Sequence, residues 1–339
     1  MLENRPQIDE AIKRTSAWAD ALVTGQGVSG CSESLKAHYK APYCMSRVGN
    51  VVGAVHILRH LVSRFSNDGR FDRGVANRQP WVGGTYSNAW VAAAAFELGL
   101  HDIATHTLDA IERSIHPDIG APPNLPAQQD ETTFYDAGSV SRAIESFLNA
   151  GRVEPAVRLG LFLKTMFDTQ PIDAKVVTWA RDWKGALFSP ANQGQNKPTL
   201  MIELGANGQC YWFLGFAIRC FARLYRIDRW VGWLDTANRI RSWLDRCSDD
   251  KTANITNAKL GWGTAEMYAV TGDERWSSYA VKVIDWLVTR QTPQGIWVRP
   301  EFSSAAEQPT DVSMDTSIER MYYLQEMSRA LAWRAPYAS

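Results

Sequence analysis

The feature that most constrains this chain is a series of paired helical segments, in which a short turn joins two stretches of different character. Apolar residues recur at the three- and four-residue intervals of one α-helical face, and no stretch alternates convincingly as a strand does. Gly99, Gly151 and Gly272 fall where a helix ends and the backbone needs a residue that tolerates positive φ. Four such pairs cover residues 86–99 with 100–115, 135–151 with 152–167, 208–226 with 227–247, and 256–273 with 274–291.

The two members of each pair differ in composition. The first is rich in alanine, glycine and aromatic residues and has few charges, which indicates a helix surrounded by protein. The second carries charges on one face, such as Asp109 and Glu112, as a solvated helix does. Residues 45–65 and 315–334 are predicted as further inner helices, and residues 7–23 as an outer one. The sequence thus predicts six inner helices and at least five outer helices.

Six helical hairpins can close into a ring, which leaves no apolar face without a partner. We therefore predict an all-α fold, an (α/α)6 toroid in which residues 1–339 form a single domain. An open stack of hairpins would show a stricter period and shorter loops between pairs. The long loops of this chain all precede an inner helix, so they are expected to gather at one rim and to carry function. They are residues 70–84, 117–135, 169–205 and 291–314.

Two segments resemble known toroids. "QTPQGIW", residues 291–297, resembles the Gln…Gly-x-Trp element that closes repeats in terpenoid-cyclase-like toroids. Residues 265–288 resemble the hairpins of six-hairpin glycosidases and sugar epimerases. The resemblance implies a shared scaffold with a central small-molecule site, and not one particular chemistry.

The sequence lacks the signatures of the individual branches of these toroids. It has neither the aspartate-rich metal motif of ionisation-type terpene synthases nor the Asp-x-Asp-Asp of protonation-type cyclases, since the nearest stretch, residues 311–317, does not match. Sugar 2-epimerases of this fold use histidines in the later repeats, whereas the last histidine here is His116. The Cys-His-Gly zinc motif of thiol-adding peptide cyclases is missing as well. The resemblance therefore identifies no specific family member.

The composition excludes several classes of function. Basic and acidic residues balance at 36 each, so neither nucleic acid nor an anionic membrane is expected as a partner. The N-terminus lacks the apolar core of a signal peptide and no apolar run is long enough to span a bilayer, so a cytoplasmic protein is expected. The five cysteines lack metal-type spacing. We expect no metal, no cofactor and a small-molecule substrate; the sequence does not indicate an oligomeric state.

Acid/base candidates lie in the stretches that enter the predicted inner helices. Carboxylates are preferred there, because an apolar setting raises the pKa of a general acid. Asp136 also fits an N-cap of the helix that follows it, Glu203 also fits an ion pair with an arginine, and Thr316 with Glu319 fits a capping box. The predicted catalytic residues are Asp136, Glu203, Asp315, Asp130, Glu131 and His38.

Aromatic and amide side chains in the same stretches are predicted to bind the substrate. Tryptophan and tyrosine can stack on sugar rings or stabilise a carbocation through their ring faces, and packing in the core is the alternative. Asparagine and glutamine suit hydroxyl groups, although asparagine is also common where helices begin. The predicted substrate-binding residues are Tyr39, Arg47, Trp81, Tyr86, Asn88, Trp90, Tyr135, Asn207, Gln209, Tyr211, Trp212, Asn257, Trp262 and Trp297.

Three hypotheses on function follow. The first is a cofactor-independent enzyme that uses carboxylate acid/base chemistry on a small hydroxylated substrate, in carbohydrate processing by glycoside hydrolysis or elimination. The second is a cyclase or isomerase of a terpenoid-like or other natural product with one protonating aspartate, and the third is a non-catalytic binding toroid. A sugar enzyme predicts polar groups among the aromatic side chains of the cavity, whereas a cyclase predicts an apolar cavity with one acid. A binding toroid predicts that amide substitution of Asp136 and Glu203 leaves function intact.

Overall fold

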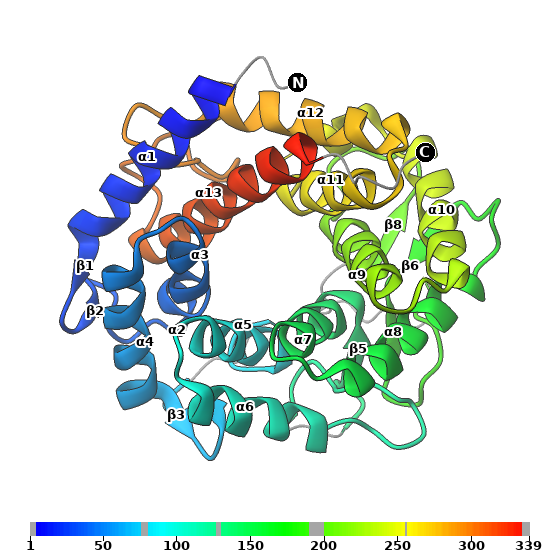
Figure 1. The fold of residues 1–339 in the computed structure, drawn as a ribbon, viewed down its shortest axis with the longest axis horizontal. Coiled ribbons are helices and arrows are strands. Elements are labelled where there is room, and N and C mark those ends of the chain that lie inside the picture. The colour runs from blue at the N-terminus through cyan, green and yellow to red at the C-terminus, as the bar shows by residue number, and fades with distance from the viewer. Residues whose placement is uncertain (1–4, 76–80, 127–129, 190–199, 255, 334–339) are drawn as a thin grey trace.

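Two concentric rings of helices make up the protein (Figure 1). The computed structural model describes residues 5–75, 81–126, 130–189, 200–254 and 256–333. Each inner helix packs against two inner neighbours, and α13 contacts both α11 and α3, so the ring closes. This closed ring confirms the predicted (α/α)6 toroid. The inner helices are α3 (Ala41–Arg47), α5 (Thr85–Glu97), α7 (Ala137–Asn149), α9 (Trp212–Asp228), α11 (Ala258–Thr271) and α13 (Thr310–Ala332).

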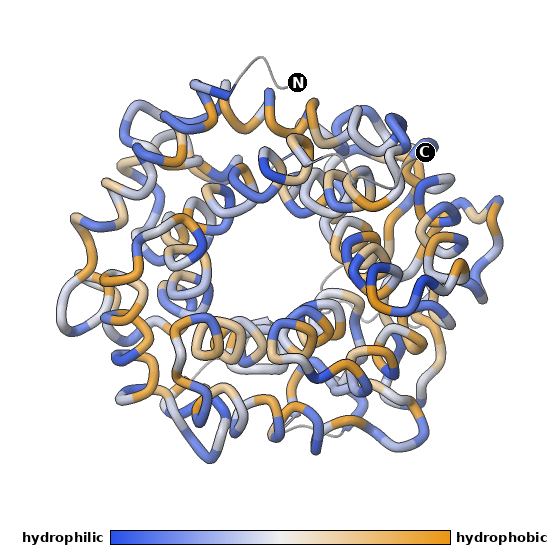
Figure 2. The backbone as a smooth tube through the Cα atoms, viewed as in Figure 1, coloured by the Kyte–Doolittle hydropathy of each residue, from blue (hydrophilic) through white to orange (hydrophobic). Residues whose placement is uncertain are grey.

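The outer helices cover the inner ring with one face each. In α6 the buried residues Ala104, Thr107, Leu108 and Ile111 form one stripe, whereas α5 is buried at every position from Thr85 to Ala95. Hydrophilic and hydrophobic segments accordingly alternate along the outer helices (Figure 2). No helix in the described part of the chain has the length and apolar character needed to cross a membrane. The outer helices are α1 (Arg5–Leu22), α4 (Val51–Phe65), α6 (His101–Arg113), α8 (Val153–Asp168), α10 (Val231–Arg246) and α12 (Glu274–Arg290).

The first hairpin differs from its prediction. Residues 45–65 were expected to form one inner helix, but Gly49 at φ +96° interrupts them and Asn50 caps α4 through a bond from the amide of Gly53. Helix α4 belongs to the outer ring, and the inner position is taken by α3 with the short helix α2 (Leu35–His38) before it. The prediction was wrong because the apolar residues of α4 form a single stripe, which is the pattern of an outer helix.

Short strands, which the sequence did not predict, occur in the connecting loops. Two pair with the neighbouring turn of the chain: β1 (Val23–Thr24) with β2 (Gly27–Val28), and β3 (Ser66–Asn67) with β4 (Arg70–Phe71). The other two pairs join different loops, β5 (Phe134–Asp136) with β7 (Ala180–Asp182) and β6 (Val176–Thr178) with β8 (Met201–Glu203). A single 3-10 helix, η1 (Asp249–Thr252), is found in the described residues.

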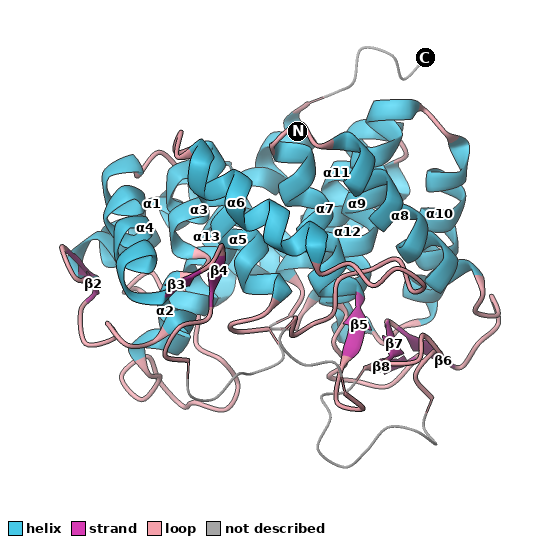
Figure 3. Ribbon diagram, turned by 90° about the horizontal axis from the view of Figure 1, so that it is seen from below, coloured by secondary structure: helices cyan, strands magenta, loops and turns pink. Residues whose placement is uncertain are grey.

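The loops that precede the inner helices lie at one end of the ring (Figure 3), as predicted. Parts of four of these loops, residues 76–80, 127–129, 190–199 and 255, lie outside the described residues. The pairing of β5 with β7 ties the loop before α7 to the loop before α9. The inner helices therefore start at a common rim, and the residues of their first turns converge there.

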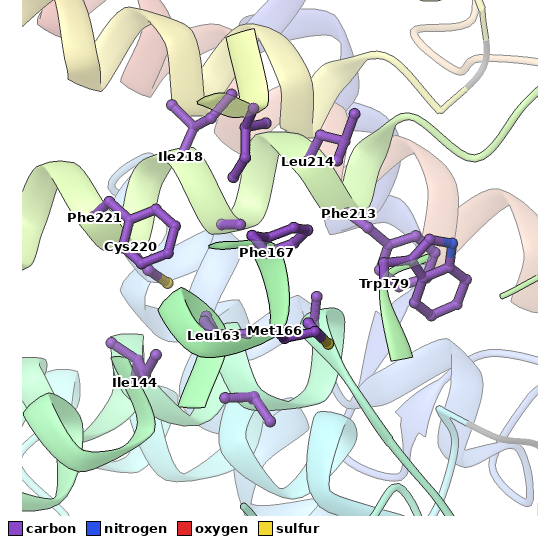
Figure 4. Packing of buried hydrophobic residues seen from close by; sticks show 14 of the residues in the cluster. Ile144, Leu163, Met166, Phe167, Trp179, Phe213, Leu214, Ile218, Cys220 and Phe221 are labelled. Atoms are coloured by element: carbon purple, nitrogen blue, oxygen red, sulfur yellow. The ribbon is translucent and has the colours of Figure 1, made fainter. Parts of the chain in front are cut away.

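Packing between the rings holds this rim in place. Ile144 of α7, Leu163 and Phe167 of α8 and Phe213 of α9 belong to one buried cluster, and Trp179 from the loop between β6 and β7 stacks on Phe213 (Figure 4). Apolar burial of this kind stabilises by about 25 cal/mol per Å² removed from water. The loop before α9 is thus anchored in the core of the toroid.

Two glycines bring α9 and α11 into backbone contact. A Cβ on Gly263 would lie 2.0 Å from the carbonyl oxygen of Gly215, and one on Gly215 would lie 2.3 Å from the carbonyl oxygen of Lys259. No side chain larger than hydrogen fits at either position without moving a helix. This close approach sets the position of Lys259 in the first turn of α11.

Candidate functional site

A cavity of about 400 Å³ opens among the N-terminal ends of the inner helices. Its wall includes residues that begin α11 and α9, residues from the loops before α3, α5 and α9, and one face of α13. A larger hollow of about 610 Å³ lies elsewhere, between α1 and the C-terminal half of α13, and contains none of these helix starts. The cavity is lined by Lys36, Tyr39, Lys40, Trp81, Val82, Tyr86, Cys210, Trp212, Thr256, Ala258, Lys259, Arg299, Asp315, Thr316, Glu319 and Arg320.

A cluster of four charged side chains forms part of this wall: Lys40, Lys259, Asp315 and Glu319, called here the Lys–Glu cluster. Lys40 Nζ lies 2.8 Å from Asp315 Oδ1 and 3.3 Å from Glu319 Oε2. Lys259 Nζ lies 2.6 Å from Glu319 Oε1. The two carboxylates are one turn apart on α13 and so face the same side of that helix. The cluster joins α13 to the starts of both α3 and α11.

Tyrosine hydroxyls complete the surroundings of Glu319. The hydroxyl of Tyr323 donates to Glu319 Oε1 over 3.1 Å, and that of Tyr86 lies 3.5 Å from the same oxygen. Burial raises the pKa of Tyr39, Tyr86 and Tyr323 well above the usual value. All three phenols therefore remain protonated and can donate hydrogen bonds at neutral pH.

Two members of the Lys–Glu cluster, Glu319 and Lys40, keep their charges at neutral pH. Burial alone opposes ionisation of Glu319, but the charges of Lys259 and Lys40 outweigh it and hold the pKa of this carboxyl well below its usual range. Burial also opposes the charge on Lys40, whereas Asp315 and Glu319 more than compensate and raise the pKa of Lys40. Glu319 is thus a fixed anion and Lys40 a fixed cation.

Lys259 can exchange a proton near neutral pH. Burial lowers its pKa to about 8, and the nearby charge of Lys40 adds to the effect while Glu319 opposes it. A general acid or base works best when its pKa is close to the working pH. Lys259 meets this condition, which an ionised Glu319 does not.

Aromatic side chains form walls beside the charged cluster. Trp212 and Trp81 meet edge to face with their centroids 5.9 Å apart, and Tyr86 lies 6.3 Å from Trp212. Lys259 Nζ sits 5.0 Å from the centroid of the Trp212 ring. The cavity therefore combines flat apolar faces with charged and hydroxyl groups, which is the usual lining of a small-molecule site.

Of the predicted catalytic residues, Asp315 lines the cavity. Asp136 is fully buried and caps α7, with Oδ1 accepting from the amide of Ser139 over 2.8 Å, so the alternative interpretation of Asp136 as an N-cap is confirmed. Burial raises the pKa of Asp136, although hydrogen bonding with Ser139 opposes the rise. Asp136 is not among the described residues that line the cavity.

The other predicted catalytic residues lie away from the cavity. Glu203, Asp130 and Glu131 are exposed in the loops of the rim. His38 is buried: its Nδ1 lies 2.6 Å from the carbonyl oxygen of Ser34, and its Nε2 accepts from the amide of Val28 over 2.9 Å. Burial lowers the pKa of His38 to about 4, so this imidazole is neutral and supports α2.

Four of the predicted substrate-binding residues, Tyr39, Trp81, Tyr86 and Trp212, line the cavity. Two others, Trp90 and Trp262, are buried beneath guanidinium groups. Arg142 lies 3.7 Å above the ring of Trp90, and Arg219 lies 3.8 Å above that of Trp262. Cation–π contacts of this kind stabilise the centre of the ring.

The remaining predicted binding residues serve the scaffold or the rim. Arg47 ends α3 and pairs with Glu97 and Glu326, far from the helix starts. Four others form hydrogen bonds within the scaffold. Asn257 donates to the carbonyl of Thr252, and Asn88 accepts from the amide of Phe71. Trp297 donates to the carbonyl of Leu287, and Tyr211 donates to the carboxylate of Asp250. Tyr135 is buried in β5, and Asn207 and Gln209 lie in the loop that leads to the cavity residue Cys210.

The sequence reasoning missed Lys40, Lys259 and Glu319. All three lie in the stretches from which the site residues were predicted. The available signal was the lysine in the first turn of α11, a helix with only one other charged residue, Glu266. Glu319 was assigned to a capping box with Thr316, which is wrong because α13 begins at Thr310 and both residues lie inside the helix. The described residues contain no group of three or more His, Cys, Asp and Glu side chains that could hold a metal ion.

No protein-family model matches the sequence, and no curated protein matches it either. Solved structures are similar over nearly the whole chain. D-mannose isomerase superposes with a TM-score of 0.73 at 12% identity, over 97% of this chain and 99% of that chain. Cellobiose 2-epimerase from Spirochaeta thermophila gives 0.65 at 12% identity over 98% and 99%, and a GH76 α-mannanase from Bacteroides thetaiotaomicron gives 0.61 at 11% over 96% and 97%. At these identities the likeness is one of fold, that of six-hairpin (α/α)6 toroids.

Proposed function

We propose that this protein is a carbohydrate-processing enzyme whose reaction is a proton transfer on an open-chain sugar, as in isomerisation or epimerisation. The observation that carries the proposal is the Lys–Glu cluster in an aromatic cavity. Two solved structures with this fold are named as a D-mannose isomerase and a cellobiose 2-epimerase. The terpenoid-like alternative required an apolar cavity with one acid, whereas seven charged side chains line this one.

Glycoside hydrolysis fits the cavity less well. Hydrolysis needs a protonated carboxyl group and a second carboxyl group on opposite sides of the scissile bond. Asp315 and Glu319 lie on one face of one helix, and both contact lysine. A GH76 α-1,6-mannanase is described as inactive when two consecutive aspartates are replaced. The one Asp-Asp pair of this sequence is Asp249–Asp250, in η1, and Asp250 there binds the hydroxyl of Tyr211 and the amide of Gly208.

In the proposed reaction, neutral Lys259 removes the proton from C2 of an open-chain aldose. The electron pair of the C2–H bond forms a C1=C2 double bond, and the carbonyl oxygen O1 becomes negatively charged. The ammonium group of Lys40 and the phenols of Tyr39 and Tyr86 are available to stabilise this charge. Return of the proton to C1, with transfer of the O2 proton to O1, gives the ketose; return to the other face of C2 gives the epimer.

The test is hydrogen exchange at C2. The protein is incubated in D₂O with a panel of free aldoses and ketoses. Loss of the C2 proton signal of the aldoses, loss of a C1 proton signal of the ketoses, and formation of products are followed by ¹H NMR. Aryl glycosides and α-1,6-mannan are assayed in parallel for hydrolysis. We expect exchange and isomer or epimer formation with at least one free sugar, and no release from the glycosides.

Matched variants complete this test. Lys259→Met is expected to lower the rate of exchange at least 10³-fold, on the order of the loss of a general base. Lys282→Met, on the exposed face of α12, is expected to leave the rate unchanged. Glycoside hydrolysis without exchange, or full activity of Lys259→Met, would refute the proposal.

A further inference from the structure

The cavity carries an excess of positive charge in a chain that is neutral overall. Lys36, Lys40, Lys259, Arg299 and Arg320 line it together with Asp315 and Glu319, so three positive charges are left over among the described lining residues. The whole sequence has 36 basic and 36 acidic residues. The excess is therefore local, and it coincides with the cavity.

The carboxylates of the cavity are already engaged by lysines. Asp315 contacts Lys40, and Glu319 contacts Lys40 and Lys259. Three further basic side chains belong to the wall: Lys36, Arg299 and Arg320.

Both arginines line the cavity, and the charge of Arg299 acts on Arg320. Burial lowers the pKa of Arg320 to about 10, and the charge of Arg299 lowers it further while Glu319 and Asp315 oppose the effect. Arg320 still carries its charge at neutral pH, and its Nη1 donates to the carbonyl of Thr316 over 2.7 Å. Arg299 has its ion-pair partner outside the cavity, since its Nη2 lies 2.7 Å from Glu301. Two guanidinium groups in the wall of one cavity, one of them buried, favour an anion in that cavity.

The backbone at the starts of two helices also favours an anion in the cavity. The first turns of α9 and α11 reach the cavity wall through Trp212, Ala258 and Lys259. The N-terminal end of an α-helix carries a partial positive charge, worth about 0.3–1 kcal/mol toward a nearby anion. An adjoining hollow, which shares Lys36 and Val82 with the cavity, contains the acidic side chains Glu33 and Asp311 and so does not extend the positive region.

We infer that the substrate is an anionic sugar, one that bears a phosphate or a carboxylate group, bound with its anion at Arg320, Arg299 and Lys36 and its carbonyl carbon at Lys259. This inference rests on the proposed function for the position of the carbonyl, whereas the anion site rests on the charges of the wall. Bidentate contacts of a guanidinium with either group would orient the sugar relative to the Lys–Glu cluster.

The inference is tested by titration calorimetry on the intact protein. The probes are D-mannose 6-phosphate, D-glucuronate, their neutral parents D-mannose and D-glucose, and inorganic phosphate, each at 50 and 200 mM NaCl. We expect at least one anionic sugar to bind at least 10-fold more tightly than its parent, with affinity that falls as salt rises. Whether the phosphate or the carboxylate binds more tightly identifies the anionic group.

Variants locate the site. Arg299→Gln and Lys36→Gln should each weaken binding of the anionic sugar 3- to 10-fold and leave the affinity for the neutral sugar unchanged. Arg290→Gln, at the exposed end of α12, is the control and should change neither affinity. These variants avoid the Lys–Glu cluster, so they test the anion site separately from the chemistry.

The following outcomes overturn the inference: neutral sugars that bind as tightly as both anionic ones, variants that weaken both kinds of sugar equally, inorganic phosphate that binds as tightly as the sugar phosphate, or no binding by any anionic probe. The exchange assay on the same sugars separates the two proposals. Anionic sugars that bind but do not exchange contradict the proposed function alone, and exchange restricted to neutral sugars contradicts the charge inference alone.

Discussion

Replacement of Glu319 by glutamine tests the electrostatic reasoning about the site most directly. Glu319 is the ion-pair partner of Lys259 at 2.6 Å and a second partner of Lys40 at 3.3 Å, and its side chain is only 8% exposed. The amide keeps the shape and can still accept from Tyr323, but it leaves Lys259 buried beside Lys40 without this anion. Loss of one partner of a buried ion pair lowers the free energy of unfolding by about 3–5 kcal/mol. Because the hydrogen bond from Tyr323 is retained, we expect Glu319→Gln to lower it by about 3 kcal/mol, the lower end of this range.

The assay is thermal and urea unfolding followed by circular dichroism at pH 7. Unfolding entropy scales with chain length at about 2.1 cal/mol/K per residue, so for this chain about 3 kcal/mol corresponds to a Tm lower by about 4 °C. Glu10→Gln, at a position where the side chain is 54% exposed, is the control and should change the free energy of unfolding by less than about 0.5 kcal/mol.

The same variant makes two pH predictions. The pKa of Glu319 is lowered on folding, so its contribution to stability is present above the unfolded-state pKa and is lost as pH falls toward the folded-state value. The stability difference between wild type and Glu319→Gln should therefore shrink below about pH 4. Because Glu319 raises the pKa of Lys259, that pKa should fall further in the variant, and the pH profile of C2 exchange should move toward acid. Equal stability together with an unchanged profile would refute the reasoning.

Three further predictions follow from other parts of the structure. The wild-type rate of C2 exchange should rise with pH through an apparent pKa near 8 as Lys259 loses its proton, and a profile that is flat between pH 6.5 and 9 would contradict this. Gly263→Ala should lower the free energy of unfolding in urea by at least about 2 kcal/mol, because the added Cβ meets the carbonyl oxygen of Gly215 at 2.0 Å; wild-type stability would show that the helices can separate at no cost. The pKa of His38 is lowered to about 4 by burial, so wild-type stability should fall as pH drops from about 6.5 to 4, and His38→Gln should lose less stability over that range when unfolding is measured at each pH.

Several parts of the fold could be predicted from the sequence because they depend on local composition. Helices such as α5, which is uniformly apolar, and α6, which has one apolar stripe, differ in their residues alone, and the number of inner helices and the closed ring follow from that contrast. Asp136 was predicted first as a catalytic residue, but its alternative interpretation as an N-cap, which the structure confirms, also rests on local sequence, since capping needs only a short side chain directly before a helix. The boundary at Gly49 and Asn50 was missed because one turn of chain separates α3 from α4.

The composition of the site depended on contacts that no local pattern encodes. Lysine is almost never fully buried unless it is paired, so Lys40 and Lys259 did not stand out as candidates in the sequence. Their partner Glu319 lies in the last inner helix, whereas Lys40 precedes the first. Patterns in the sequence cannot show which residues from opposite ends of the chain form ion pairs in the fold.

The sequence by itself determined an all-helical toroid of hairpins, with the loops that lead into its inner helices gathered at one rim and rich in aromatic residues. Only the tertiary structure decided which charges share the cavity, because α13 packs against both α3 and α11 where the ring closes. That closure removes Lys40, Lys259 and Glu319 from water together. Burial and the nearby charge of Lys40, neither of which is a property of the separate segments, lower the pKa of Lys259 toward neutrality, although Glu319 opposes the shift.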